Sequence, residues 1–220
     1  QRPPGPQSEV ELKVPAEPGD YELRYVLNES ERVLVSRPIK VVAASVYVRG
    51  PAEVAAGAVI EVEAAGPIDN GHWIGFAPAG SDAGSYRDYT RPVDGQTRYS
   101  LRAPGEPGDY ELRYVLNESA AIAASQPIRV LAAQVRLEAP AESAAGMLVP
   151  VTVEGPAGGG AWVGFAPVGA DDGAWEGEYS GFETSPMSVQ LKAPDAAGSY
   201  EIKLVSGDGK VLARRAITLR

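Results

Sequence analysis

The sequence contains no cysteine and only one histidine among its 220 residues. The absence of cysteine excludes disulfide bonds, zinc–thiolate sites and cysteine nucleophiles. The single histidine, His72, excludes a histidine-dependent triad in each of several repeats, and no G-x-S-x-G nucleophile motif is present. We therefore expect no enzyme activity, no catalytic residues, no metal ligands and no cofactor.

Clusters of basic residues and long apolar runs are also missing. The formal charge is −9, and the 20 Lys and Arg residues are scattered, which argues against a nucleic-acid partner. No stretch approaches the roughly 18 consecutive apolar residues that cross a bilayer, so no membrane span is expected. The acidic residues are spread over many segments, which favours solubility.

An internal repeat is the main positive feature. PAEPGDYELRYVLNES at 15–30 recurs as PGEPGDYELRYVLNES at 104–119, and a weaker copy lies at 194–209. GHWIGFAPAGSDAGSY at 71–86 likewise matches GAWVGFAPVGADDGAW at 160–175. Copies this similar indicate tandem duplication of one structural unit.

The repeated unit has the period of a β-strand. Tyr110, Leu112 and Tyr114 alternate with Glu111 and Arg113, as in a half-buried strand. Short strands bounded by Gly and Pro, in units of just under 90 residues, indicate β-sandwiches. We predict an all-β chain of tandem immunoglobulin-like β-sandwiches.

The repeat also predicts the domain organisation. Residues 45–133 and 134–220 each contain a whole unit, and residues 1–8 form a Pro-rich linker. Residues 9–44 match only the late strands, with 9–14 corresponding to the strand expected at 97–103. This segment is a half module, because nothing before it matches the Trp-bearing strand.

A half module exposes an apolar face. Two or three strands alone are marginal in water, and an exposed apolar patch marks an interface. We expect a missing segment of a longer parent chain, or the half module of a second copy in two-fold pairing, to complete it. The candidate interface residues are Leu12, Tyr21, Leu23, Tyr25, Ile39 and Val41.

Aromatic residues recur at matching sites. Trp73 and Trp162 occupy one position of the repeat, and further aromatics follow each of them. Exposed aromatics of this kind could stack on sugar rings, or Trp73 and Trp162 could instead fill the core or shield its edge. Gly75 and Gly164 favour the second interpretation, with the indole packed over backbone. The candidate ligand-stacking residues are Trp73, Tyr86, Tyr89, Trp162, Trp175 and Tyr179.

Several single positions have simpler interpretations. His72 is expected to face solvent or lie at a strand edge. Asp82 aligns with Asp171, in either a polar hairpin tip or a calcium site. AGGGAW at 157–162 predicts a flexible turn, because it lacks the Lys and Ser/Thr of a phosphate loop.

Tyr21, Tyr110 and Tyr200 each follow a Gly by two residues. This spacing is typical of a tyrosine corner, in which the hydroxyl bonds to upstream backbone. We expect these residues to be structural, because each is in phase with the core face of its strand.

The motifs W-[IV]-G-F-x-P-x-G, P-G-D-Y-E-L-R-Y-V-L and R-P-I-x-V resemble tandem modules found downstream of von Willebrand factor type A domains in bacterial proteins. The W-I-G-F portion is also similar to fibronectin-III-like modules. The resemblance implies an extracytoplasmic bacterial setting (periplasmic, cell-surface or secreted) and an accessory or adhesive role. We expect a structural or interaction module (a spacer, stalk or assembly element), or alternatively a carbohydrate- or ligand-binding module.

Overall fold

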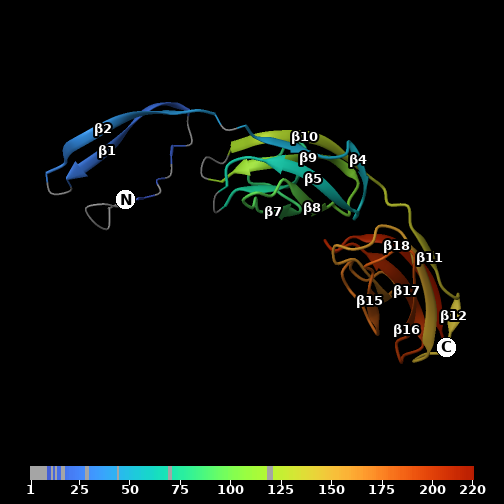
Figure 1. Cartoon of the computed structure of the whole chain (residues 1–220). Coiled ribbons are helices and arrows are strands. Elements are labelled where there is room, and N and C mark those ends of the chain that lie inside the picture. Colours follow the sequence, from blue (N-terminus) through green and yellow to red (C-terminus); the bar gives the residue numbers. More distant parts are fainter. Residues whose placement is uncertain are drawn as a thin grey trace. The chain divides into compact units, whose positions relative to one another are not determined.

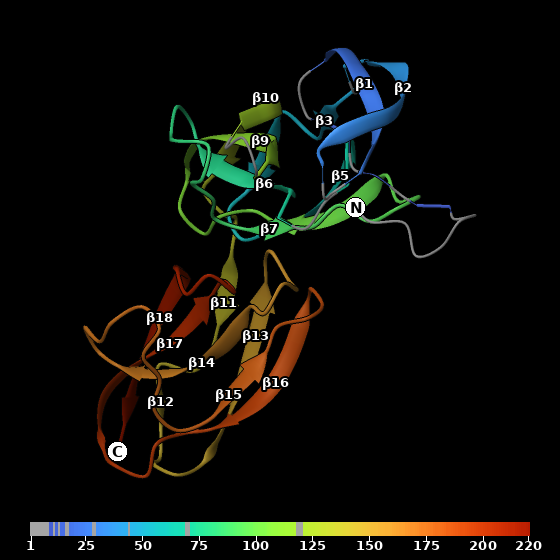
Figure 2. The ribbon, with the colours of Figure 1, turned by 90° about the vertical axis from the view of Figure 1, so that its left-hand side faces the viewer.

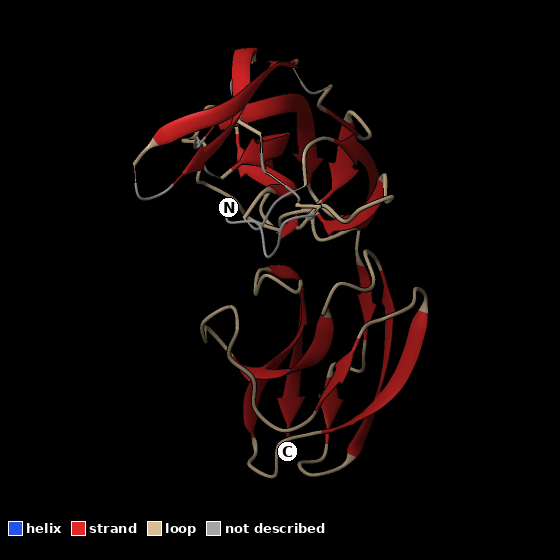
Figure 3. Cartoon of the chain, turned by 60° about the vertical axis from the view of Figure 1, so that its left-hand side comes forward, coloured by secondary structure: helices blue, strands red, loops and turns tan. Residues whose placement is uncertain are grey.

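The computed structural model shows an all-β chain, which confirms the predicted fold class (Figure 3). It describes residues 9–10, 12, 14–15, 18–27, 30–43, 45–68, 71–117 and 121–220. The predicted linker at 1–8 lies outside these residues. In the part of the chain that is described, no helix is long and apolar enough to cross a membrane. The chain divides into two compact units, residues 1–45 and 46–220.

The first unit contains one antiparallel hairpin. Strands β1 (Gly19–Leu27) and β2 (Arg32–Val41) form a two-stranded sheet, with Tyr21 opposite Ile39 and Tyr25 opposite Val35 (Figure 1). The register shifts between Tyr25 and Val26. We refer to β1 and β2 together as the hairpin.

The strand expected at 9–14 is not formed by its described residues, Glu9, Val10, Leu12 and Val14. In each complete unit the matching strand hydrogen-bonds to an earlier strand of its own sheet, β8 (Arg98–Arg102) to β5 (Val59–Ala65) and β16 (Met187–Lys192) to β13 (Leu148–Glu154). The hairpin unit has no sequence counterpart of that earlier strand. In the described part of this unit the only sheet is β1 with β2, so Glu9, Val10, Leu12 and Val14 join no ladder there.

The middle sandwich consists of eight strands in two sheets. One sheet has the order β3 (Tyr47–Arg49), β5 (Val59–Ala65), β8 (Arg98–Arg102). The other has the order β4 (Glu53–Ala55), β10 (Ala121–Leu131), β9 (Gly108–Leu116), β6 (Trp73–Pro78), β7 (Tyr89–Thr90). Strand β4 runs parallel to β10, and the other pairs are antiparallel.

The C-terminal sandwich repeats this topology (Figure 2). Its sheets have the orders β11 (Arg136–Glu138), β13 (Leu148–Glu154), β16 (Met187–Lys192) and β12 (Glu142–Ser143), β18 (Val211–Leu219), β17 (Gly198–Val205), β14 (Trp162–Pro167), β15 (Tyr179–Gly181). In each sandwich the first, third and sixth strands form one sheet, and the fourth, seventh and eighth form the centre of the other, with the short second and fifth strands at its edges. Two such packed sheets are the immunoglobulin-like arrangement. Tandem immunoglobulin-like sandwiches are therefore confirmed.

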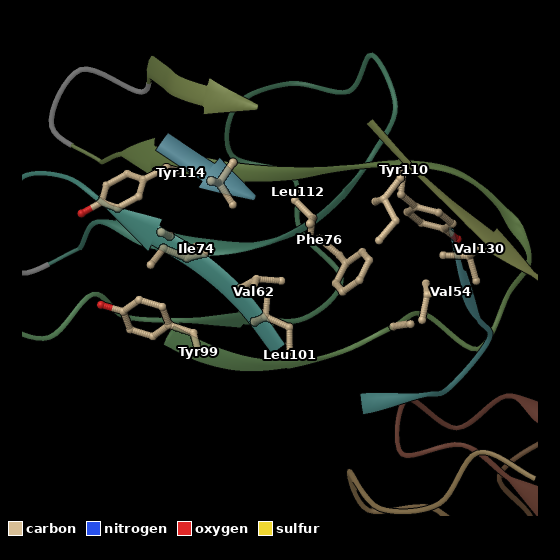
Figure 4. Packing of buried hydrophobic residues seen from close by; sticks show 14 of the residues in the cluster. Val54, Val62, Ile74, Phe76, Tyr99, Leu101, Tyr110, Leu112, Tyr114 and Val130 are labelled. Atoms are coloured by element: carbon tan, nitrogen blue, oxygen red, sulfur yellow. The ribbon is translucent and has the colours of Figure 1, made fainter. Parts of the chain in front are cut away.

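Alternating residues of both sheets fill the core of the middle sandwich. Leu112 and Phe76 come from one sheet and Val62 and Leu101 from the other, and all four are buried (Figure 4). Tyr114 is also fully buried, and its hydroxyl donates to the Pro67 carbonyl oxygen at 2.6 Å. Burial raises the pKa of Tyr114 to about 12, since the ionised form would lose both hydration and this hydrogen bond.

The tyrosine corner is confirmed in one of the two sandwiches. The Tyr110 hydroxyl donates to the Glu106 carbonyl oxygen, four residues upstream, at 3.0 Å. The Tyr200 hydroxyl instead reaches a side chain, the Glu176 carboxylate, at 3.5 Å. Both rings are buried, so both residues are structural, as expected.

Candidate functional site

The first candidate site is the surface of the first unit, which contains the hairpin. Leu12, Leu23, Tyr25 and Ile39 are exposed, with 47% of Leu23 accessible, while Tyr21 and Val41 are half-buried. The structure thus places the predicted interface residues on one unit, and most of them are open to solvent.

Sequence reasoning missed further exposed apolar residues in this unit. Val35 and Val42 are 65% and 71% exposed, and both side chains are more exposed than any of the predicted interface residues. Val26, Leu27, Val33 and Leu34 are also exposed. Strand alternation assigned some of these positions to the polar face, but the hairpin carries apolar residues on both faces.

Strand β1 has the same nine-residue sequence as β9, GDYELRYVL. In the middle sandwich β9 lies between β10 and β6. Among the described residues, β1 is paired only with β2. The same sequence therefore forms a central strand in the middle sandwich and an edge strand in the hairpin.

Arg113 and Arg24 show what the missing neighbours contribute. Arg113 is 1% exposed and Arg24 is 57% exposed. The Arg113 guanidinium donates to the main-chain oxygens of Asp82, Ser81 and Pro78 at 2.9, 3.0 and 3.4 Å. Its Nε also donates to Glu111 at 2.8 Å. Arg24 has the equivalent 2.8 Å contact with Glu22.

The C-terminal sandwich has a lysine in the place of Arg113. The Lys203 ammonium group donates to the main-chain oxygens of Asp171 and Asp172 at 2.8 and 3.1 Å. Burial lowers the pKa of Lys203 from its ordinary value. The turns that contain Asp82 and Asp171 therefore bind a cationic side chain through their backbone oxygens. Among the residues that the structure describes, no cluster of three acidic or histidine side chains could hold a metal ion.

The second candidate site is a pair of aromatic clusters, one on each sandwich. In the middle sandwich the Tyr86 ring centroid lies 5.9 Å from Trp73 and 4.7 Å from Tyr89. In the C-terminal sandwich the Tyr179 centroid lies 5.8 Å from Trp162 and 5.1 Å from Trp175. Trp73 is buried, but Tyr86, Tyr89, Trp175 and Tyr179 are exposed. The structure thus brings all six predicted stacking residues together, three in each cluster.

The glycine after each Trp has a different role from the one expected. A Cβ on Gly75 would lie 2.3 Å from the Asp88 carbonyl oxygen, and one on Gly164 would lie 2.7 Å from the Tyr179 Cβ. These glycines thus permit the close approach of β7 to β6 and of β15 to β14. Phe76 faces the core, whereas Trp73 belongs to neither core cluster and contacts the exposed Tyr86.

A small cavity accompanies the cluster of the middle sandwich. It has a volume of ≈ 250 Å³ and is lined by Trp73, Tyr86 and Tyr89 together with polar His72, Arg91 and Asn117. His72 is buried, so of its two expected positions the solvent-facing one was wrong; the residue directly precedes β6. Its Nδ1 accepts a hydrogen bond from the Asn117 backbone N–H at 3.2 Å, because it directly precedes β6 and faces the end of β9.

A larger depression of ≈ 690 Å³ lies on the C-terminal sandwich. The charged groups at this depression are already paired. Lys192 Nζ lies 3.0 Å from Asp195 Oδ1, and the Glu178 carboxylate accepts the Lys192 backbone N–H at 2.6 Å. Asp88 accepts the Arg102 backbone N–H in the same way at 2.6 Å. These acidic residues secure a loop to a strand in both sandwiches.

No family model matches the chain, and no curated protein matches it. Among solved structures, it is similar to the BSP domain of a biofilm-associated protein (14% identity, TM-score 0.27), covering 80% of this chain and 29% of that one. It is also similar to the D0-D1 domain of intimin (12%, 0.28), covering 80% and 97%. A third is a variant of Salmonella alpha-2-macroglobulin (13%, 0.29), covering 93% and 19%. The association with von Willebrand factor type A domains stays a prediction.

Proposed function

We propose that this chain is a structural spacer of a bacterial surface or secreted protein, and that its hairpin is an assembly element completed by a partner. The observation that carries the proposal is the contrast between β1 and β9. The two strands share one sequence, yet β9 is buried in a closed sandwich and β1 is exposed. A partner that covers β1 would bury side chains whose counterparts in β9 are already buried in the middle sandwich.

The two sandwiches support a spacer role. Each has a closed core of its own, and their buried charged groups bind neighbouring turns. Arg113 and Lys203 are both satisfied by backbone oxygens, and in the described part no buried side-chain polar atom lacks a hydrogen-bond partner. Such groups stabilise the loops that they bind.

A dye that binds exposed apolar surface tests the assembly surface. We expect the fluorescence of anilinonaphthalene sulfonate to be several-fold stronger with the full chain at submicromolar concentration than with the dye alone, because open apolar surface binds this dye. Substituting Leu23→Thr, Tyr25→Thr and Val35→Thr together should remove most of the increase, since threonine keeps the strand propensity but not the apolar area.

The matched control is Val168→Thr, an exposed apolar residue of the C-terminal sandwich. A lone exposed side chain does not form a patch, so this variant should retain the dye response of the unchanged chain. No dye response from the unchanged chain, or an equal response from the triple variant, would contradict the proposal.

The aromatic clusters favour a second candidate, carbohydrate binding. Exposed rings beside polar side chains suit a sugar, whose apolar ring face stacks and whose hydroxyls hydrogen-bond. The ≈ 250 Å³ cavity at Trp73 is smaller than the roughly 300–1,000 Å³ of larger ligand sites. It therefore suits a single sugar ring.

Tryptophan fluorescence with a panel of mono- and oligosaccharides separates the two candidates. The spacer proposal expects no saturable change with any sugar. A carbohydrate-binding module should give a saturable change that Tyr86→Ala abolishes, because Tyr86 links Trp73 to Tyr89. Tyr47→Ala, at a ring on β3 beside Arg49, is the control that should preserve such a change.

A further inference from the structure

We infer that the partner of the hairpin is a second copy of this chain, joined by antiparallel pairing of β1 with β1 around a two-fold axis at Leu23. The inference rests on the proposed function, since it names the partner of the assembly element.

The backbone of β1 has its open edge at defined residues. In the middle sandwich the Asp109 carbonyl oxygen accepts the Ala79 N–H at 3.1 Å, so Asp109 and every second residue after it point toward β6. These include Glu111 and Arg113, which correspond to Glu22 and Arg24. The peptide groups of Glu22 and Arg24 therefore face the edge that β6 would occupy, where a second strand can pair.

The charges of β1 are self-complementary in one register. With Leu23 opposite Leu23 of the second copy, Glu22 of each strand lies directly opposite Arg24 of the other. The two Glu22–Arg24 pairs are hydrogen-bonded pairs, because the peptide groups of both residues face the shared edge. Opposite charges directly across two strands stabilise a sheet. The exposed Glu22–Arg24 pair of each strand would become a group of four alternating charges.

Neighbouring registers lack this match. A shift by two residues in one direction places Arg24 opposite Arg24, and in the other direction it places Glu22 opposite Glu22, although Arg24 then faces Asp20. Like charges directly opposite destabilise a sheet, and only the register at Leu23 has opposite-charge pairs without a like-charge pair. A shift by one residue places the outward peptide groups opposite inward ones, so the ladder cannot form. The charge pattern therefore selects the two-fold register at Leu23.

The other face of the paired sheet is apolar. Leu23 would meet its counterpart in a non-hydrogen-bonded pair, where side chains approach most closely. Tyr21 of one copy would lie opposite Tyr25 of the other, and aromatic pairs of this kind add stability. The product is a four-stranded sheet with one face that is apolar except for Arg37, the partner of Leu23 on β2, and four strands exceed the two that are marginal alone.

Charge reversal with rescue tests the pairing. The unchanged chain of 23.0 kDa should double in mass by sedimentation equilibrium at tens of micromolar. Glu22→Arg alone and Arg24→Glu alone should each be monomeric, because each places like charges opposite each other. An equimolar mixture of these two variants, and the double variant Glu22→Arg/Arg24→Glu, should both recover the doubled mass.

The matched control is Arg136→Glu. Arg136 and Glu138 form a similar exposed pair two residues apart on β11, which is also the edge of its sheet. This variant should have the same mass as the unchanged chain. Single reversals that stay dimeric, a mixture that stays monomeric, or an unchanged chain that is monomeric at all these concentrations would each overturn the inference.

The dye experiment separates this failure from failure of the proposed function. A monomeric chain whose dye response depends on Leu23, Tyr25 and Val35 would retain the assembly surface and exclude the second copy as its partner. A monomeric chain without that dye response would overturn both.

Discussion

Arg113→Met is expected to lower the free energy of unfolding of the middle sandwich by about 3–5 kcal/mol, the usual cost of breaking a buried charged contact. The substitution removes the donors that satisfy three backbone oxygens of the turn after β6. It also leaves the carboxylate of Glu111, only 25% exposed, without its partner. Urea unfolding, followed by hydrogen exchange of the β6 peptide, measures the effect on this sandwich alone.

Two variants make the result specific. Arg24→Met changes the same residue of the same nine-residue sequence, but Arg24 is exposed, so the unfolding of the middle sandwich should change by less than about 0.5 kcal/mol. Arg113→Lys should retain much of the stability, since Lys203 binds the equivalent turn in the C-terminal sandwich. An equal loss from methionine and lysine would show that the backbone oxygens do not need the cation.

Gly75→Ala is expected to lower the free energy of unfolding of the middle sandwich by about 2–3 kcal/mol, in the upper range for overpacking a tight contact. The new methyl group would lie 2.3 Å from the Asp88 carbonyl oxygen and 2.9 Å from the Tyr89 Cα. Both are backbone atoms, so β7 must move away from β6. Urea unfolding monitored by Trp73 fluorescence, with Trp162 and Trp175 replaced by Phe, detects the loss.

Gly84→Ala is the control for this prediction. Gly84 follows β6 in the same turn region, has no positive φ and has open space around an added Cβ. Its unfolding free energy should stay within about 0.5 kcal/mol of the unchanged sandwich. A comparable loss at Gly84 would attribute the effect to glycine itself instead of to the contact between β6 and β7.

Repeat and alternation were sufficient to predict the sandwiches, because both are local properties of the sequence. Tyr110, Leu112 and Tyr114 are buried as the two-residue period indicated. The same period placed Arg113 on the polar face, which is correct for the sheet, but it could not show that the residue is buried. That burial depends on a turn some 30 residues away folding over the guanidinium, and no local pattern encodes it.

The clusters of aromatic residues were predicted in part. Matching positions in two repeats identified all six residues, since duplication preserved them. The role of Gly75 was misread, because a glycine beside a Trp is compatible with packing of either the indole or a neighbouring strand. Only the placement of Asp88 and Tyr89 against β6 distinguishes the two. Likewise, whether Glu9, Val10, Leu12 and Val14 form a strand depends on a neighbouring strand that the segment's own sequence does not reveal.

The identity of β1 and β9 also creates a problem of choice during folding. The same nine-residue sequence occurs both before and after β6 in the chain. There are 45 residues between β1 and β6 and 29 between β6 and β9. This difference in loop length favours β9 by only about 0.4 kcal/mol.

The strands attached to them differ more. Gln126 on β10 both accepts from and donates to the Gly50 backbone, at 3.0 and 2.8 Å, and the equivalent position on β2 is Arg37, which has no acceptor for the Gly50 N–H. A single amide side chain on the adjoining strand therefore helps to decide which of two identical strands enters the sandwich.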